Sequence, residues 1–338
     1  MRTEIRIFKL LLLVMLLGMA GLVNAQKLRF SEAGEFKIIQ FTDMHIDYKH
    51  GYNDPVFNLM SEIVDAERPD LVMLTGDIVV KSNALEVYQQ FEKLFAARKL
   101  HWALVLGNHD EEYGSTREQL VEMLKKMPHC LTTMQKGIRG ASNFALPVLG
   151  KDHITKAVIY GLDSNSHSRI EDRVDGYDWF GLDQIVWYQK ISAAYTQKNG
   201  GKPLPALAFF HIPFTEYNEA WDNKDVKPIG VKNERVSCPD ANSGMFAAML
   251  ESNDVMGTFV GHDHTNDYIG VSHNVALAFG RCSGGENAYG DLPDGGRVIV
   301  LKEGKRTFDT WIHEKGGNIV YKCSYPDSFL VPIKKQKG

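Results

Sequence analysis

The strongest constraint on the fold is a repeating pattern in which short apolar runs alternate with helical stretches. Seven runs are predicted to be buried strands: 36–41, 71–75, 102–106, 157–160, 206–210, 255–260 and 275–279. Helices are predicted between them at about 54–69, 84–98, 183–197 and 242–252, and a capping box at Ser115 and Glu118 opens a further helix. This alternation predicts an α/β fold with largely parallel strands covered by helices. In such folds, ligands bind beyond the carboxyl ends of the strands.

Two stretches lack this pattern. Residues 213–241 and the glycine-rich residues 281–296 are predicted to be long loops that border the site. Residues 297–301 and 307–313 are predicted to be strands of a second sheet. Because the sequence contains no internal repeat, low-complexity tract or clear linker, residues 26–338 are predicted to form a single domain.

The first 25 residues have the pattern of a signal peptide. Three basic residues lie near the start, an uncharged apolar run follows at 10–23, and Val23-Asn24-Ala25 offers a small-residue cleavage site. The alternative is an uncleaved membrane anchor, but this run of 14 residues is shorter than the roughly 20 that a spanning helix needs. We therefore predict cleavage after residues 1–25, a mature chain without a stable membrane span, and export to the periplasm or the cell exterior.

Charge and cysteine content argue against two other classes. With 38 basic and 42 acidic residues, the chain lacks a cationic excess, and no specific nucleic-acid binding is expected. The cysteines contain no Cys-x-x-Cys pair, which argues against a structural zinc site. The sequence leaves open whether the four pair after export or stay buried thiols: Cys130, Cys238, Cys282 and Cys323.

Polar clusters follow five of the predicted strands, and they contain five of the twelve histidines: His45, His109, His211, His262 and His264. Carboxylate, amide oxygen and imidazole together suit a pair of divalent or mixed-valence first-row metals. Asp77 can bridge two ions, because a carboxylate has two oxygens with several lone pairs. The alternative is that these groups only cap the sheet. Five clusters together favour a two-metal hydrolytic site.

The motifs also follow a recognisable order along residues 43–264: Asp43-x-His45, Gly76-Asp77, Gly107-Asn108-His109-Asp110, His211 and Gly261-His262-x-His264. This ordered set resembles the calcineurin-like metallophosphoesterase superfamily. Four segments narrow the resemblance to one branch: 115–120, 176–179, 209–213 and 261–268. That branch contains fungal dosage-dependent cell-cycle-regulator phosphatases, purple-acid-phosphatase-related plant proteins and exported bacterial homologues.

The resemblance implies a four-layer α/β/β/α sandwich with two metal ions (manganese, iron, zinc or a mixture) at the C-terminal ends of strands. It implies these ligands for the first ion: Asp43, His45, Asp77 and His264. It implies these for the second: Asp77, Asn108, His211 and His262. His109 would donate a hydrogen bond or proton to the phosphoryl or leaving-group oxygen, with Asp110 orienting its imidazole.

One position departs from true purple acid phosphatases, in which a tyrosine three residues after the bridging aspartate binds iron(III) and gives the colour. Val80 stands there in this chain, so we predict a colourless enzyme. Arg281 follows the predicted strand 275–279 and is our candidate contact to substrate phosphate, because a guanidinium fork matches phosphate oxygens. The alternative is a surface arginine with no part in the site.

The predicted function is an exported binuclear metal-dependent phosphoesterase in which a metal-bound hydroxide attacks phosphorus directly, without a covalent phosphoenzyme. By resemblance, the preferred substrate is a phosphomonoester, either a small molecule or a macromolecule. One alternative is a phosphodiesterase that acts on a nucleotide or lipid headgroup, and another is a non-catalytic, metal-stabilised binding protein. The sequence leaves the physiological substrate, the native metals and the oligomeric state open.

Overall fold

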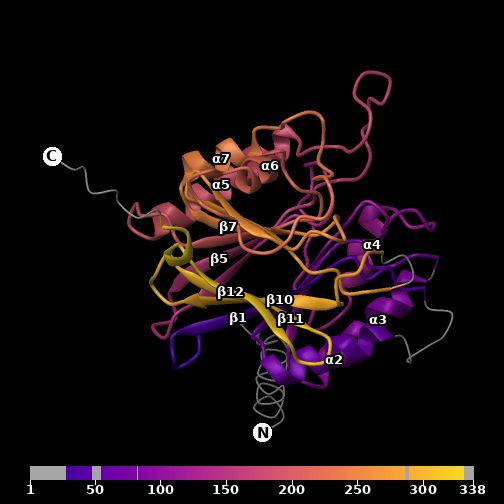
Figure 1. Cartoon of the computed structure of the whole chain (residues 1–338), viewed down its shortest axis with the longest axis horizontal. Helices are drawn as coiled ribbons and strands as arrows, with labels where there is room; N and C mark the ends of the chain where they lie inside the picture. The colour runs from indigo at the N-terminus through magenta and orange to yellow at the C-terminus, as the bar shows by residue number, and fades with distance from the viewer. Residues whose placement is uncertain (1–27, 48–54, 82, 286–288, 331–338) are drawn as a thin grey trace, which may run out of the picture.

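Two six-stranded sheets packed face to face form the centre of the protein, and helices cover the outer face of each sheet (Figure 1). The computed structural model describes residues 28–47, 55–81, 83–285 and 289–330. The predicted signal peptide lies outside these described residues. Among them, no helix is both long and apolar enough to cross a membrane.

The first sheet contains the N-terminal strands. Its order is β12 (Ile319–Tyr325), β11 (Phe308–Glu314), β10 (Gly295–Lys302), β1 (Glu35–Phe41), β2 (Leu71–Thr75) and β3 (His101–Val105). β1, β2 and β3 are parallel, whereas β10 pairs antiparallel with both β1 and β11. β12 completes the antiparallel half of the sheet.

The second sheet repeats this mixture of directions. Its order is β4 (Phe144–Leu149), β5 (Thr155–Gly161), β6 (Ala206–Phe209), β7 (Val255–Val260), β9 (Val275–Phe279) and β8 (Ile269–Ser272). The four central strands are parallel, and the two edge strands, β4 and β8, are antiparallel to their neighbours. β7 is buried on both faces, as expected of a central parallel strand.

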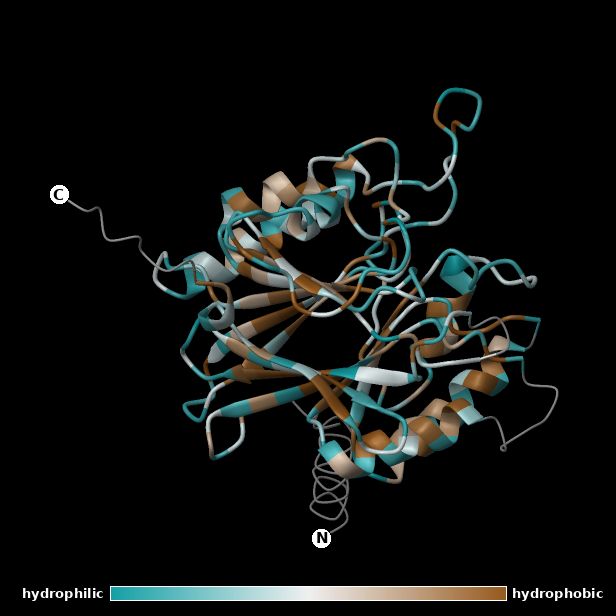
Figure 2. Ribbon diagram, viewed as in Figure 1, coloured by the Kyte–Doolittle hydropathy of each residue, from teal (hydrophilic) through white to brown (hydrophobic). Residues whose placement is uncertain are grey.

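Three apolar layers hold the sheets and helices together. The helices α2 (Pro55–Glu67), α3 (Ala84–Ala96) and α4 (Arg117–Leu124) pack on the first sheet, while α5 (Leu182–Lys198), α6 (Glu216–Trp221) and α7 (Met245–Ser252) pack on the second. Between the sheets, Phe259 contacts Phe209 of its own sheet and Phe308 of the facing one, with ring centroids 5.1 and 5.7 Å apart. Figure 2 shows the apolar residues along the strands and on the helix faces that meet them. This arrangement is the expected α/β/β/α sandwich.

The structure corrects three local predictions. The predicted strands near 297–301 and 307–313 form no separate sheet, because β10 pairs directly with β1. The capping box of α4 lies one residue further on: Thr116 accepts from the backbone N–H of Gln119, whose side chain accepts from Thr116 in return. Residues 213–241 were predicted to be a long loop, but they contain the short helix α6. The strands β4, β8 and β12 had no sequence prediction.

The four cysteines are free thiols, two of them buried and two partly buried. Burial raises the pKa of Cys130 to about 12 and that of Cys323 to about 11. In this structure the cysteines pack as small apolar side chains, and no disulfide links them.

Candidate metal centre

The predicted ligands lie in the loops where parallel strands from both sheets end. In chain order they are Asp43 and His45 after β1, Asp77 after β2, Asn108 after β3, His211 after β6, and His262 and His264 after β7. Six of them form two groups of three, and the donor atoms within each group lie within 4.8 Å of one another. We name these groups the Asp43 half-site (Asp43, His45, His264) and the Asp77 half-site (Asp77, His211, His262).

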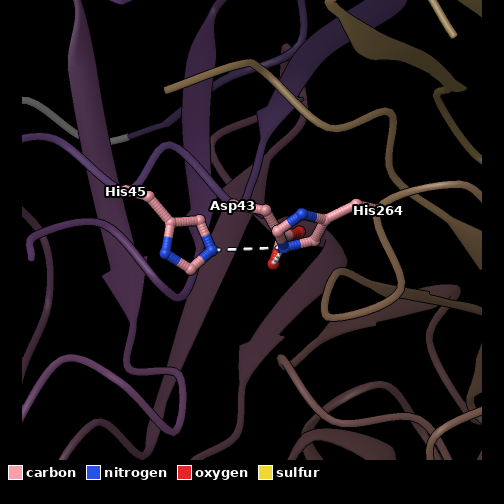
Figure 3. Close-up of side chains that lie close together, drawn as sticks. All are labelled: Asp43, His45 and His264. Carbon is pink, nitrogen blue, oxygen red and sulfur yellow. Dashed lines mark hydrogen bonds and ion pairs between the residues drawn. The ribbon is translucent and has the colours of Figure 1, made fainter. Parts of the chain in front are cut away.

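The Asp43 half-site joins a loop of the first sheet to a loop of the second (Figure 3). The Nε2 atoms of His45 and His264 face each other at 3.2 Å, and His264 Nε2 lies 3.6 Å from Asp43 Oδ1. The Asp43 carboxylate also accepts from the backbone N–H of His262 and the hydroxyl of Thr42. Two imidazole nitrogens and one carboxylate therefore converge on one point.

In the Asp77 half-site, a hydrogen bond to the protein backbone holds one of the ligand rings. The imidazole of His211 donates through Nδ1 to the Thr75 carbonyl at 2.7 Å, so its Nε2 faces the site. That Nε2 lies 3.1 Å from both Asp77 Oδ2 and Asn108 Oδ1. His45 Nε2 lies 4.0 Å from the same Asp77 oxygen, so Asp77 stands between the two half-sites, as expected of a bridging ligand.

The backbone at the ligands is strained in a way that indicates function. Four ligands have positive φ angles, which cost non-glycine residues about 1–3 kcal/mol each and cluster at functional sites: Asp43 (54°), His45 (41°), Asp77 (52°) and His262 (79°). Gly107 and Gly261 allow the loops to approach closely, since a Cβ at either would collide with the carboxylate of Asp77 or Asp43.

The donor set fits a pair of metal ions. Among the predicted ligands, His262 Nε2 is buried without a hydrogen-bond partner in the described part of the chain, and the Nε2 atoms of His45 and His264 converge beside Asp43. Burial lowers the pKa of His45 and lowers that of His262 well below its usual value, which keeps these imidazoles neutral, as metal ligands must be.

The pKa of His211 is shifted in the opposite direction to those of His45 and His262. Burial alone would lower the pKa of His211, but the Asp77 carboxylate outweighs it and raises the pKa to about 9. Burial likewise opposes the charge on Asp77, yet His211 and His45 hold its pKa well below the usual range. The carboxylate is therefore ionised and available to cations from both sides.

Asp110 does not have the predicted contact with the imidazole of His109. Its Oδ1 accepts from the backbone N–H groups of Ile78 and Val79, and its Oδ2 from those of Asp77 and Gly107. Asp110 thus fixes the loops that carry Asp77 and Asn108. Burial, followed by the nearby Asp77 charge, raises its pKa.

His109 lies at the wall of a cavity of about 280 Å³ that opens over both half-sites. The cavity is lined by His45, Asp77, Val80, His109, Glu112, Tyr113, Tyr177, Ser237, His262, His264 and Tyr289. Val80, three residues after Asp77, is part of this lining. The ring of Tyr177 meets that of His262 edge-on, and Tyr289 stacks on His264, each with centroids 4.4 Å apart.

Arg281 does not reach this cavity. Its guanidinium is 1% exposed and forms ion pairs with Asp267 and Glu314, and it also donates to the carbonyl of Pro293. All three guanidinium nitrogens donate to these protein acceptors, and the side chain is buried away from the cavity lining, so in this geometry it does not reach a phosphate bound there. Arg281 anchors the segment beside Thr42, where Ser283 donates to the Thr42 carbonyl.

Glu112 and Tyr289 are among the cavity residues that the sequence prediction did not include. Glu112 accepts from Nδ1 of His109 at 2.8 Å, and its spacing of three residues from a candidate acid was a usable signal. Tyr289 donates to Glu234 at 2.9 Å, and Glu234 in turn accepts from Thr265. A tyrosine in a glycine-rich loop gives no comparable signal.

Comparison with known proteins places this geometry in context. The sequence pattern described as calcineurin-like phosphoesterase matches residues 36–266. A protein of Arabidopsis thaliana named "Probable inactive purple acid phosphatase 29" is 32% identical, and the match covers 90% of this chain and 88% of that protein. The phosphatase DCR2 of Saccharomyces cerevisiae is 28% identical over 85% of this chain, which corresponds to 55% of the yeast protein.

A solved structure supports the fold independently. The crystal structure of a dimetal phosphatase from Danio rerio superposes with a TM-score of 0.57 at 13% identity, covering 86% of this chain and 98% of that one. At this identity the likeness establishes the shared two-sheet architecture.

Proposed function

This chain belongs to the calcineurin-like phosphoesterase family, a family of phosphoester hydrolases, and on that premise we propose that it is a two-metal phosphomonoesterase. The observation that carries the proposal is the convergence of the Asp43 and Asp77 half-sites beneath one cavity. Two bound ions would supply Lewis acidity and an activated water for attack on phosphorus. The name of the yeast relative, a phosphatase, supports the preference for monoesters.

In this proposal the chain's own residues have separate tasks. The two half-sites and Asn108 would hold the ions, with Asp77 available to both. His109 lies at the cavity wall and donates a hydrogen bond or proton to the leaving-group oxygen. Tyr177 and Tyr289 pack on ligand imidazoles and limit the freedom of those rings.

The test compares a chromogenic phosphate monoester with its bis-ester, using protein reloaded with manganese and analysed for bound metal. We expect turnover of the monoester. On an alkyl monoester, followed by phosphate release, turnover should fall at least about a hundredfold in His109→Ala, because a general acid contributes about 10²–10⁴-fold where the leaving group is poor. A preference for the bis-ester would keep the metal chemistry but replace the monoesterase proposal with a phosphodiesterase acting on nucleotides or lipid headgroups.

A non-catalytic binding protein is the second candidate, and the word "inactive" in the name of the Arabidopsis relative is the observation that favours it. Against it, this chain retains all seven predicted ligands and His109. Asp77→Ala should abolish both metal binding and turnover. If the wild type binds two metals yet hydrolyses neither ester, the enzyme proposal fails and the binding protein replaces it.

We also propose that the protein is exported, because residues 1–25 have the composition of a cleaved signal peptide. Expression of the full chain in a bacterium followed by N-terminal sequencing tests this directly. A mature chain that starts near Gln26 in the exported fraction is expected. A chain that keeps Met1 would contradict the proposal.

A further inference from the structure

His109 and Glu112 form a side-chain pair on the turn that follows β3. His109 Nδ1 and Glu112 Oε1 lie 2.8 Å apart, and because a carboxylate can only accept, Nδ1 carries the proton of this hydrogen bond. Both side chains line the cavity above the half-sites. The backbone N–H of His109 donates to Asp77 Oδ1 at 2.8 Å, which ties this turn to the metal centre.

No other carboxylate takes the place of Glu112 in the described part of the site. Both oxygens of Asp110 are engaged by backbone N–H groups of the two ligand-bearing loops, as described above. Glu111, the other acid of the turn, lies beside Arg117 at 3.4 Å. The orientation of the His109 ring therefore depends on Glu112.

We propose that Glu112 is a positioning residue for His109. This inference rests on the proposed function. By keeping the proton on Nδ1, Glu112 leaves Nε2 as the ring nitrogen that serves the substrate. In the reaction, the P–O bond to the leaving group breaks as the water oxygen bonds to phosphorus. When both ring nitrogens of His109 are protonated, the leaving oxygen takes the proton from Nε2 while Nδ1 keeps its proton on the Glu112 side. A proton from the attacking water, relayed through solvent, then returns to Nε2.

Because this pair is partly exposed, an effect of Glu112 on catalysis can be distinguished from an effect on folding stability. The side chains of His109 and Glu112 are 40% and 37% exposed, and exposed ion pairs add little to folding. Loss of Glu112 should therefore appear in turnover and leave the fold intact. Glu122 and Lys125 form a similarly exposed pair with the same three-residue spacing, 2.7 Å apart and outside the cavity lining, so Glu122→Ala is a matched control.

The first test varies the leaving group. An alkyl phosphate needs a proton donor far more than p-nitrophenyl phosphate, whose leaving group is already stable as an anion. We expect Glu112→Ala to lower kcat about 10–100-fold on the alkyl ester and less than about threefold on the aryl ester, with KM nearly unchanged. Glu112→Gln, whose amide oxygen can still accept from Nδ1, should recover most of the loss. Equal losses on both esters would overturn the proposal.

The second test asks whether Glu112 acts through His109. In a His109→Ala background, Glu112→Ala should have no further effect on kcat, because the group that it positions is gone. If the two losses multiply instead, Glu112 acts independently of His109 and the proposal fails.

A third measurement does not depend on turnover. Ring ¹⁵N spectra of metal-free protein should show His109 protonated at Nδ1 in the wild type and shifted toward the Nε2–H tautomer in Glu112→Ala, with no change in Glu122→Ala. If the wild type hydrolyses no ester, the proposed function fails while the spectra still decide whether Glu112 sets the ring. Unchanged His109 signals in Glu112→Ala would overturn the positioning role itself.

Discussion

The two half-sites have similar donors, yet the protein supports them differently. In the Asp77 half-site, His211 is held by the Thr75 carbonyl, and the Asp77 loop is held by Asp110. In the Asp43 half-site, neither His45 nor His264 has a partner at Nδ1 among the described residues. Protein hydrogen bonds therefore hold His211 and Asp77 in the Asp77 half-site, whereas the rings of His45 and His264 in the Asp43 half-site would depend more on a bound ion.

The largest effect is expected from a substitution of Arg281, which anchors the segment that pairs with Thr42 beside the Asp43 half-site. Arg281→Met removes a buried cation and leaves Asp267 and Glu314 without their partner, which typically costs about 3–5 kcal/mol. The segment that Arg281 anchors pairs with Thr42, next to Asp43, so metal should also leave this half-site more easily. Urea unfolding and metal analysis measure both effects.

Arg173→Met is the control for this substitution, because the Arg173 side chain is 70% exposed and its loss should change stability by less than about 0.5 kcal/mol. If Arg281→Met instead leaves stability intact and raises KM for the phosphoester, Arg281 does contact substrate and the sequence-based assignment was correct.

Asp110→Asn should have the next largest effect, and it acts on the Asp77 half-site. An asparagine keeps one oxygen acceptor but loses the charge and the second oxygen that bind four backbone N–H groups. Because hydrogen bonds to charged groups contribute about 1.5–3 kcal/mol, we expect a loss of that size in the free energy of unfolding. His109→Ala, by contrast, should lower turnover with little change in stability. If the two variants behaved alike, Asp110 would be acting through the imidazole of His109.

Much of the fold was predictable because the central strands have a clear sequence pattern. β2 and β7 have the predicted bounds, since a strand buried on both faces is a continuous apolar run between polar residues. The missed strands lie at sheet edges, where the pattern weakens: β4 contains Pro147, and β12 is partly exposed. Pairing of distant strands, such as β10 with β1, depends on contacts that local patterns do not encode.

The site residues likewise include some that the sequence predicted correctly and some that it did not. The ligands were predictable because metal chemistry restricts residue type and the strand ends restrict position. Asp110 and Arg281 were assigned wrong contacts, because sequence adjacency does not reveal which way a side chain turns. Asp110 turns toward buried backbone N–H groups, and Arg281 turns toward two acids, one of them 33 residues further along the chain. A buried charge must be satisfied by the protein, and that requirement determined both orientations.

The smallest expected effect is the difference of about 1–2 kcal/mol between two ligand substitutions, and it tests the comparison of the half-sites most directly. In chelator-treated protein, His211→Ala should cost about 2–3 kcal/mol, because it removes the bond to the Thr75 carbonyl and leaves Asp77 buried without its main cation. His264→Ala removes a ring whose Nδ1 has no protein partner, so its cost should be no more than about 1 kcal/mol. Urea unfolding of the two metal-free variants provides the measurement. Equal costs would mean that the protein supports both half-sites alike. Costs that differ in metal-free protein and become equal once metal is restored would mean that the bound ion stabilises the Asp43 half-site as hydrogen bonds stabilise the Asp77 half-site.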